Sequence, residues 1–325
     1  MPLDFDQRVL DFAAGVKASG PVARLASPIS QPCTMEQITE PVFDKWVHRL
    51  GAGGGPNRKV WEWAYICEVL EQQAIRLNRP MNMLGFGVGR EPIVGWFASQ
   101  GHNITATDLP ATASETDFWD SSDQHAANAD MLDMFNLCPR DELERRVTFT
   151  PVDMRSVPLR LRGFDAVWSS CAFEHLGSLD AGLQFVRESL SCLAPDGVGV
   201  HTTEFNVSST TDTIDLGPVV LYRQSDLEEF SVKARRAGYA NTTTYNLGDD
   251  PDNALVDRPP YSVQHLRVLS GGYVTTSFGF TFQNENTASR QRTELTRRTI
   301  SQSISRIRAF AGQGRRGIRR RLART

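Results

Sequence analysis

The amino-acid sequence predicts an α/β fold in which helices cover both faces of a doubly wound, mostly parallel sheet. Three observations support this fold class. Short apolar segments alternate with segments of helical periodicity along most of the chain, which is the pattern of consecutive β-α-β units. A glycine-rich turn at Gly85–Gly89 joins the first apolar segment to a helix. With 325 residues, of which 40% are hydrophobic and 22% charged, the chain can form a substantial core.

The predicted elements follow one another in a regular order. Residues 58–78 carry apolar side chains at helical spacing, so a helix precedes the first strand. Parallel strands are predicted at residues 81–84, 103–107, 147–151, 164–169 and 198–202. Further helices are predicted from Pro92 to Gly101, at 180–193 and at 225–237. Two late strands, near 242–246 and 273–283, complete the predicted sheet.

Both ends of the chain differ from this regular region. Residues 1–58 show little periodicity and contain several Gly and Pro turn signals, so we expect a lead segment that caps the site. Residues 59–285 form the predicted α/β domain, and residues 286–325 form a basic tail that is either amphipathic or disordered. No apolar stretch is long enough to span a membrane, and no secretory signal opens the chain. The five scattered cysteines indicate reduced thiols in a cytoplasmic protein.

The turn at Gly85, Gly87 and Gly89 predicts a binding site for a nucleoside cofactor. Glycine lets the backbone approach a ligand closely, and the N-terminus of the following helix offers free N–H groups. Asp108 follows the second strand, where a carboxylate can accept hydrogen bonds from ribose hydroxyls. The spacing does not fit the dinucleotide fingerprint G-x-G-x-x-G, because Arg90 stands at its last position. The chain also lacks the phosphate-binding run G-x-x-x-x-G-K-[ST].

Three later segments narrow the class of cofactor. Asp153-Met154 follows the third strand, and Phe164–Trp168 is followed by Phe173-Glu174-His175. The segment Leu190–Gly197 ends in the turn Leu-Ala-Pro-Asp-Gly. Together with the G-x-G-x-G turn, and in the same order, these segments resemble the motifs of class I methyltransferases, which use S-adenosylmethionine (SAM). The resemblance covers roughly residues 80–205.

This resemblance implies a Rossmann-like, mostly parallel sheet of seven strands with SAM as the cofactor. The glycine turn is then expected to hold the methionyl part of SAM, Asp108 the ribose, and Asp153 with Met154 the adenine. The implied cofactor-binding residues are Gly85, Gly87, Gly89, Asp108, Asp153, Met154 and Ser170. One position departs from the family pattern: Met83 stands where the family usually has an acidic residue.

Four segments look similar to a subgroup of uncharacterised bacterial methyltransferases that are often associated with cell-surface polysaccharide or sugar biosynthesis. They are residues 84–92, 168–177, 201–206 and 259–261. This resemblance implies methyl transfer to a hydroxyl group of a sugar or surface-polysaccharide precursor, so the expected partner is a small-molecule or glycan acceptor. It leaves open a SAM-binding scaffold that has lost catalysis, an alternative that Met83 favours.

Three residues are candidates for the chemistry: His175, His201 and Glu204. His175 lies just past the fourth strand, where open α/β sheets bind ligands, and a neutral imidazole can take the proton of a hydroxyl acceptor. Alternatively, His175 hydrogen-bonds the cofactor or a loop carbonyl. His201 and Glu204 leave the fifth strand. Together with His175, with or without His265, they are expected to form a base with its orienting partner or a divalent metal site. Alternatively, they form a polar strand end that shapes the substrate pocket. Because the histidines lack the tight spacing of a metal motif, the predicted site contains no metal.

The charge of the chain is distributed unevenly. Residues 290–325 contain 12 Arg and one acid and carry a net charge of +11, whereas the whole chain carries −3, so residues 1–289 carry −14. Phosphate contacts need a basic surface around the site, which argues against nucleic acid as the main substrate. A nucleic-acid methyltransferase recruited by the tail stays an alternative. Isoleucines at helical spacing among the arginines also predict peripheral contact with the inner face of an anionic membrane.

Overall fold

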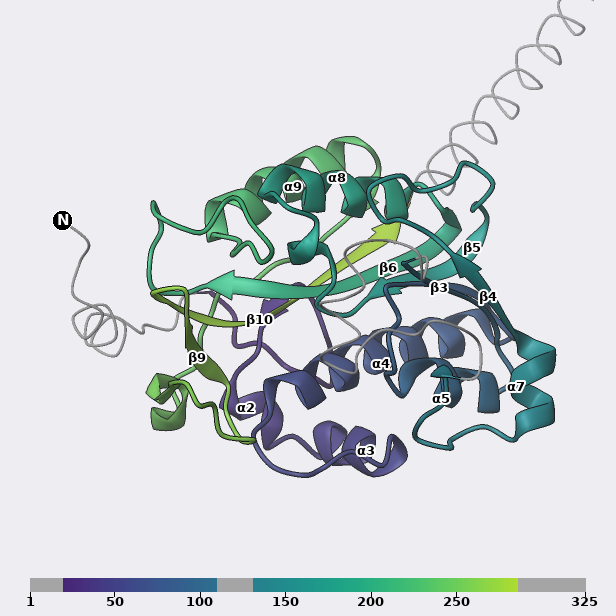
Figure 1. Cartoon of the computed structure of the whole chain (residues 1–325), viewed down its shortest axis with the longest axis horizontal. Helices are drawn as coiled ribbons and strands as arrows, with labels where there is room; N and C mark the ends of the chain where they lie inside the picture. Colours follow the sequence, from purple (N-terminus) through teal and green to yellow (C-terminus); the bar gives the residue numbers. More distant parts are fainter. Residues whose placement is uncertain (1–19, 110–130, 286–325) are drawn as a thin grey trace, which may run out of the picture. The chain divides into compact units, whose positions relative to one another are not determined.

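The computed structural model describes residues 20–109 and 131–285. In this part of the chain a ten-stranded sheet lies between two layers of helices (Figure 1). The strands are β1 (Gln31–Pro32), β2 (Asn82–Phe86), β3 (Asn103–Asp108), β4 (Val147–Pro151), β5 (Phe164–Ser169), β6 (Leu193–Asn206), β7 (Tyr239–Ala240), β8 (Val256–Asp257), β9 (Arg267–Ser270) and β10 (Tyr273–Asn284).

The strand order is that of a class I methyltransferase sheet. The path runs β4-β3-β2-β5-β6-β10, and β7 pairs with the end of β10. Strands β2 to β6 pair in parallel, whereas β10 is antiparallel to β6. The order reverses between β2 and β5, and open α/β sheets bind ligands at such a reversal. The fold that the resemblance implies is therefore confirmed.

The sheet has more strands than the seven expected. The short strands β1 and β9 pair with β10, and β8 pairs with β9. The strand predicted at 242–246 is wrong in position, because β7 lies just before it and Thr243 forms only an isolated bridge to Ser30. The predicted strand at 198–202 is too short, since β6 extends beyond both of its ends.

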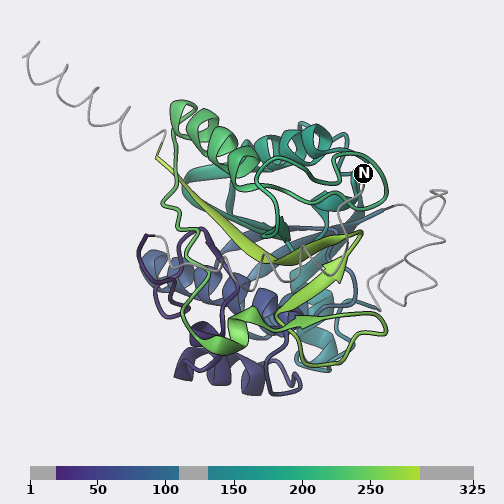
Figure 2. The same cartoon turned by 90° about the vertical axis from the view of Figure 1, so that its left-hand side faces the viewer.

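Two helical layers cover the sheet. The helices are α2 (Met35–Ile38), α3 (Pro41–Arg49), α4 (Arg58–Leu77), α5 (Ile93–Ser99), α7 (Arg140–Arg146), α8 (Leu179–Leu190) and α9 (Gln224–Arg236), with the 3-10 turns η2 (Phe173–His175) and η3 (Pro251–Ala254). Helices α8 and α9 lie on one face, and α4, α5 and α7 lie on the other (Figures 1 and 2). None of the helices in the described part of the chain has the length and apolar character to cross a bilayer.

Helix α4 begins and ends at residues suited to those positions. The Asn57 side chain accepts hydrogen bonds from the backbone N–H groups of Lys59 and Val60, so it caps the N-terminus. Asn78 ends the helix with a left-handed φ of 48°. This start places the charged first turn of α4 at the carboxyl edge of the sheet, where it reaches the cavity described below.

Side chains of β6 contribute to two hydrophobic cores, one on each face of the sheet. Val200 packs in the core that includes Trp61 of α4, whereas Phe205 packs in the core that includes Phe185 of α8. Successive side chains of a strand point to opposite faces. Even-numbered residues of β6 therefore face α4, and odd-numbered residues face α8.

The described part of the N-terminal segment extends the domain. Strand β1 pairs with β10, and helix α3 buries Trp46, whose indole N–H donates to Glu68 of α4 at 2.8 Å. Figure 1 shows α3 on the same side of the sheet as α4. Residues 20–56 do not line the large cavity. Of the expected lead segment, residues 1–58, the described residues Asn57 and Arg58 do line it, and residues 1–19 lie outside the described residues, so the cap stays a prediction.

Candidate active site

A cavity of about 690 Å³ opens at the carboxyl ends of β2, β3, β5 and β6. Its walls are the glycine turn after β2, the end of β3, the loop after β4, the turn η2 and the first turn of α4. Ser262, Val263 and His265, between β8 and β9, close one side. This is the edge of a doubly wound sheet at which ligands bind.

The three glycines of the turn have different surroundings: two line the cavity, and one packs against a core side chain. Gly87 and Gly89 have φ values of 54° and 52°, in the left-handed region that favours glycine, and both line the cavity. A Cβ on Gly87 would lie 3.3 Å from the sulfur of Met154. Gly85 instead lies within β2, and the ring of Trp168 fills the space in which its Cβ would stand. Gly85 makes room for a core tryptophan and is not among the residues that line the cavity, and its predicted contact with the cofactor stays a prediction.

Asp108 ends β3 at the cavity wall and is 8% exposed. Its Oδ2 accepts a hydrogen bond from the backbone N–H of Gly89 at 3.0 Å, and its Oδ1 accepts one from the N–H of Leu109 at 2.8 Å. The carboxylate thus ties the glycine turn to the end of β3. The ribose-binding role of Asp108 stays a prediction.

Asp153 and Met154 line the cavity from the loop after β4. Burial alone would raise the pKa of Asp153, but hydrogen bonds from Arg155, which lies 2.8 Å away, hold it below its usual value. Asp153 is therefore an ionised acceptor. Met154 is buried, with its sulfur directed toward Gly87. An acceptor beside a polarisable apolar side chain suits an adenine ring, and this role stays a prediction.

Lys59 lines the cavity, and no sequence motif predicted it. Its Nζ lies 2.6 Å from a carboxylate oxygen of Glu91 and 3.2 Å from one of Glu62, and it donates to the Oγ of Ser170 at 3.0 Å. The predicted residue Ser170, at the end of β5, is thereby tied to α4. One ammonium and two carboxylates beside the glycine turn are complementary to a zwitterionic amino-acid group. The only sequence signal was the pair Arg58-Lys59 at the start of an amphipathic helix.

His175 reaches the cavity wall from η2. Its Nδ1 lies 2.9 Å from the carbonyl oxygen of Pro218. Because a carbonyl only accepts, Nδ1 carries the proton of the neutral ring and Nε2 carries the lone pair. Burial lowers the pKa of His175 below its usual value, so the ring is neutral at pH 7. The two roles predicted from the sequence are therefore compatible: Nδ1 hydrogen-bonds a loop carbonyl, and Nε2 is the nitrogen that a base would use.

His201 does not reach the cavity, and the prediction that it is catalytic is wrong. Its Nδ1 lies 2.8 Å from the Oγ of Ser169 and its Nε2 lies 3.0 Å from the Oγ of Ser189. Burial lowers the pKa of His201 to about 3, so it is a neutral core residue. The reason is the length of β6: the strand stays extended through Asn206, so residues three apart point to opposite faces. Glu204 faces α4, whereas His201 faces α8.

Glu204 lines the cavity as a paired carboxylate. Its Oε2 accepts hydrogen bonds from Arg58 at 2.6 Å and from the Oγ1 of Thr275 at 2.9 Å. Burial alone would raise the pKa of Glu204, but the Arg58 guanidinium holds it below its usual value. Because its pKa is low, Glu204 is suited to orienting a ligand rather than to accepting a proton. Glu174, from η2, lies close by, and burial together with the charge of Glu204 raises its pKa to about 8.

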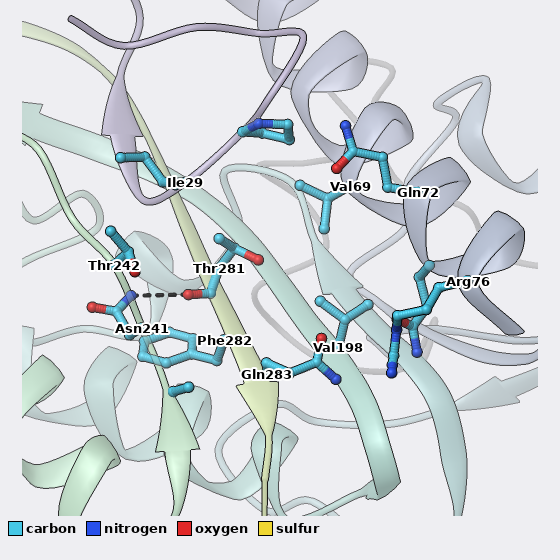
Figure 3. A pocket seen from close by; sticks show the side chains of 13 residues that line it. Ile29, Val69, Gln72, Arg76, Val198, Asn241, Thr242, Thr281, Phe282 and Gln283 are labelled. Atoms are coloured by element: carbon cyan, nitrogen blue, oxygen red, sulfur yellow. Dashed lines mark hydrogen bonds between the residues drawn. The ribbon is translucent and has the colours of Figure 1, made fainter. Parts of the chain in front are cut away.

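A second cavity, of about 400 Å³, lies near the start of β6 and the end of β10 (Figure 3). The Asn241 amide donates to the carbonyl oxygen of Thr281 at 2.9 Å. The side chains of Arg76 and Gln283 both donate to the carbonyl oxygen of Asp196. The polar groups of this cavity are thus engaged with the protein itself, and it lies at the opposite end of the sheet from the predicted site residues.

Residues 84–200 match the family model described as Methyltransferase domain. The matched segment runs from β2 into β6, and it contains the glycine turn, the ends of β3 and β5, and η2. The strand order and this match define a SAM-dependent methyltransferase domain with the class I fold, and SAM is its cofactor. The match covers a little over a third of the chain. No curated protein matches the chain.

Several solved methyltransferase structures are similar to this chain. The 1,6-didemethyltoxoflavin-N1-methyltransferase of Burkholderia thailandensis is 16% identical, with a TM-score of 0.39 over 66% of this chain and 76% of that chain. The glycopeptide N-methyltransferase MtfA is 10% identical, with a TM-score of 0.37 over 66% and 92%. The CurJ carbon methyltransferase is 13% identical, with a TM-score of 0.39 over 70% and 54%. At these values the similarity concerns the fold and does not identify an acceptor.

Proposed function

We propose that this chain transfers the methyl group of SAM to a hydroxyl group of a sugar or of a surface-polysaccharide precursor. The observation that carries the proposal is His175, a neutral imidazole fixed through Nδ1 to Pro218 at the cavity wall. A hydroxyl group is a poor nucleophile at neutral pH, so its attack gains from a base with a pKa near neutrality. On the same wall, Arg58, Glu174 and Glu204 offer donors and acceptors that suit an acceptor with many hydroxyl groups.

In the proposed mechanism some residues bind the cofactor and the acceptor, and His175 takes up the proton. SAM supplies an electrophilic methyl group on a sulfonium leaving group, so the protein mainly has to align the reactants and exclude water. In the proposed arrangement the glycine turn and Lys59 hold the methionyl part, and Asp108 holds the ribose. The Nε2 of His175 takes the hydroxyl proton as the acceptor oxygen bonds to the methyl carbon. Arg58 and Glu204, paired with each other, form part of the cavity wall that faces the acceptor.

Labelled SAM tests the proposed acceptor class. The full chain is incubated with methyl-labelled SAM and with nucleotide-activated sugars, their deoxy analogues and their amino analogues. We expect an O-methyl group on a sugar, and no label on the analogue that lacks the methylated hydroxyl. Label on nitrogen or carbon alone would overturn the hydroxyl assignment. SAM binding without turnover on any acceptor would favour the scaffold alternative.

Asp108→Ala should weaken SAM binding by about 1–3 kcal/mol, because hydrogen bonds to a charged acceptor are lost. Isothermal titration with SAM measures the change. Asp165→Ala is the matched control: Asp165 is 6% exposed, against 8% for Asp108, but it pairs with Arg79 outside the cavity. The control should lose stability and keep its SAM affinity. Unchanged SAM affinity in a folded Asp108→Ala protein would refute the ribose assignment.

The arginine-rich tail, residues 286–325, lies outside the described residues, so a role for it rests on the sequence. We propose that it attaches the protein to an anionic membrane surface. Residues 290–325 carry +11 and the rest of the chain −14, and this separation fits an attachment segment better than a part of the active site. Each basic residue near such a surface contributes ~1 kcal/mol to binding.

Removing residues 290–325 should abolish sedimentation with anionic vesicles and leave turnover of a soluble acceptor intact. Neutral vesicles and high salt serve as controls, because screening weakens binding that depends on charge. Equal sedimentation of the full and shortened chains would dismiss the membrane proposal. A loss of turnover on the soluble acceptor would mean that the tail belongs to the catalytic domain. Binding to RNA instead of vesicles would favour the nucleic-acid alternative.

A further inference from the structure

Three side chains with metal-ligating atoms lie close together in the wall of the large cavity, on the side proposed to bind the acceptor. They are Cys171, Glu174 and Glu204. The sulfur of Cys171 and one carboxylate oxygen of each glutamate all lie within 4.8 Å of one another. Cys171 and Glu174 follow β5, whereas Glu204 lies near the end of β6. All three line the cavity. The metal hypothesis drawn from the sequence depended on His201, which faces the other side of the sheet, so this group is a different set of ligands.

The two carboxylate oxygens of Glu174 differ in their hydrogen bonding. Its side chain is fully buried, and its Oε2 accepts a hydrogen bond from the Oγ1 of Thr203 at 3.1 Å. Its Oε1 is also buried and has no hydrogen-bond partner among the described residues. By contrast Glu62, another buried carboxylate of this cavity, accepts from both Ser277 and Lys59. Buried polar groups are nearly always paired, so the Oε1 of Glu174 is expected to bind a ligand that the described part of the chain does not supply.

The neighbouring charges suit a divalent cation. With the thiol and both carboxylates deprotonated the group carries three negative charges, and Arg58, 2.6 Å from Glu204, contributes one positive charge. A divalent cation would neutralise the net negative charge that remains. Arg58 and Thr275 both bind the Oε2 of Glu204, which leaves Oε1 for a metal. Hydrogen-bonded outer partners of this kind are typical of carboxylates that ligate metals.

We propose that Cys171, Glu174 and Glu204 bind a divalent cation of the zinc type, with a fourth coordination position open to the cavity. One thiolate and two carboxylates suit Zn²⁺ or Co²⁺, whereas Mg²⁺ and Ca²⁺ prefer sites made of oxygen ligands alone. Three protein ligands with one open position are the arrangement of catalytic zinc sites. The prediction of a site without metal is therefore replaced by this proposal.

The role of the cation rests on the proposed function. A hydroxyl oxygen at the open position would be polarised by the cation, and its proton would become more acidic. His175, adjacent to Glu174 in η2, takes that proton on Nε2. The electron pair of the oxygen then forms the bond to the methyl carbon, and the electron pair of the broken carbon–sulfur bond stays on sulfur. No further reactant is needed.

Titration with Co²⁺ tests the site in the absence of any acceptor. The full chain, without a metal-binding tag, should develop a thiolate-to-cobalt charge-transfer band that saturates at one Co²⁺ per chain. Added Zn²⁺ should remove the band, and added Mg²⁺ should not. Cys171→Ser should abolish the band. Mutating a residue that only hydrogen-bonds to a metal ligand typically lowers metal affinity ~10–100-fold. Glu174→Gln removes a ligand itself, so it should lower the Zn²⁺ affinity by at least this factor.

The matched control is Cys138→Ser, which removes a half-buried thiol beside Asp133 and should leave the band unchanged. No band in the wild-type protein, or a band that survives in Cys171→Ser, would overturn the proposal. Circular dichroism and SAM titration of each variant separate a lost ligand from a lost fold, and the isosteric Glu174→Gln provides a second test. If the cation binds as expected but the loaded protein methylates no hydroxyl, the proposed function fails and the cation site stands.

Discussion

His175→Ala is expected to lower kcat by about 10²–10⁴ while the affinity for SAM stays nearly unchanged. The imidazole lines the cavity just past β5, with Nδ1 directed at Pro218 and the lone pair on Nε2. Its removal takes away the group that accepts the hydroxyl proton and leaves the cofactor contacts in place. Steady-state kinetics with the acceptor, together with SAM titration, measure the two effects separately.

The pH dependence gives the same prediction a second readout. A base must be neutral to act, so the wild-type rate should rise with pH and reach a plateau above the pKa of His175. Burial lowers that pKa below its ordinary value of 6.5, so the rise should lie on the acid side of 6.5. His175→Asn separates the two roles, because the Asn amide can still donate to Pro218 but cannot take a proton. Wild-type activity in His175→Asn would exclude His175 as the base and leave the methyltransferase assignment intact.

Gly87→Val should abolish SAM binding. Gly87 has a φ of 54°, and a Cβ at this position would lie 3.3 Å from the Met154 sulfur in the cavity wall. A β-branched side chain would therefore occupy space that the cofactor needs and would also strain the turn. The measurement is the thermal stabilisation that SAM gives to the wild-type and variant proteins.

Gly163→Val is the control for backbone strain. Gly163 also has a positive φ, of 84°, but nothing lies within 4 Å of the Cβ that a substitution would add. This variant should lose stability and still be stabilised by SAM. If SAM stabilises Gly87→Val as strongly as the wild type, the glycine turn is not the cofactor site.

Local sequence patterns predicted the elements and the cofactor half of the site. The order strand, glycine turn, helix and strand places Gly87, Gly89 and Asp108 together, because each lies next to the end of a regular element. Such positions follow from the topology of a parallel sheet alone. The extra strands β1, β8 and β9 are only two to four residues long, so they carry no periodicity that the sequence could show.

The rest of the site depends on contacts between residues far apart in the chain. Lys59 meets Ser170, and Arg58 meets Glu204, from different elements, so no local spacing indicates either pair. The error at His201 has another cause. Pairing with β10 keeps β6 extended as far as Asn206, beyond the strand end expected at residue 202. Because side chains alternate along a strand, the position of its end decides which residues face the cavity.

The most direct test of the central claim is a crystal structure of the chain with S-adenosylhomocysteine. The claim is that the cavity of about 690 Å³ holds the cofactor with its sulfur toward η2. We predict ribose hydroxyls within hydrogen-bonding distance of Asp108, the amino-acid group beside Gly87 and Lys59, and the sulfur facing His175. A ligand bound in the second cavity, or bound here with its sulfur turned away from His175, would contradict the claim.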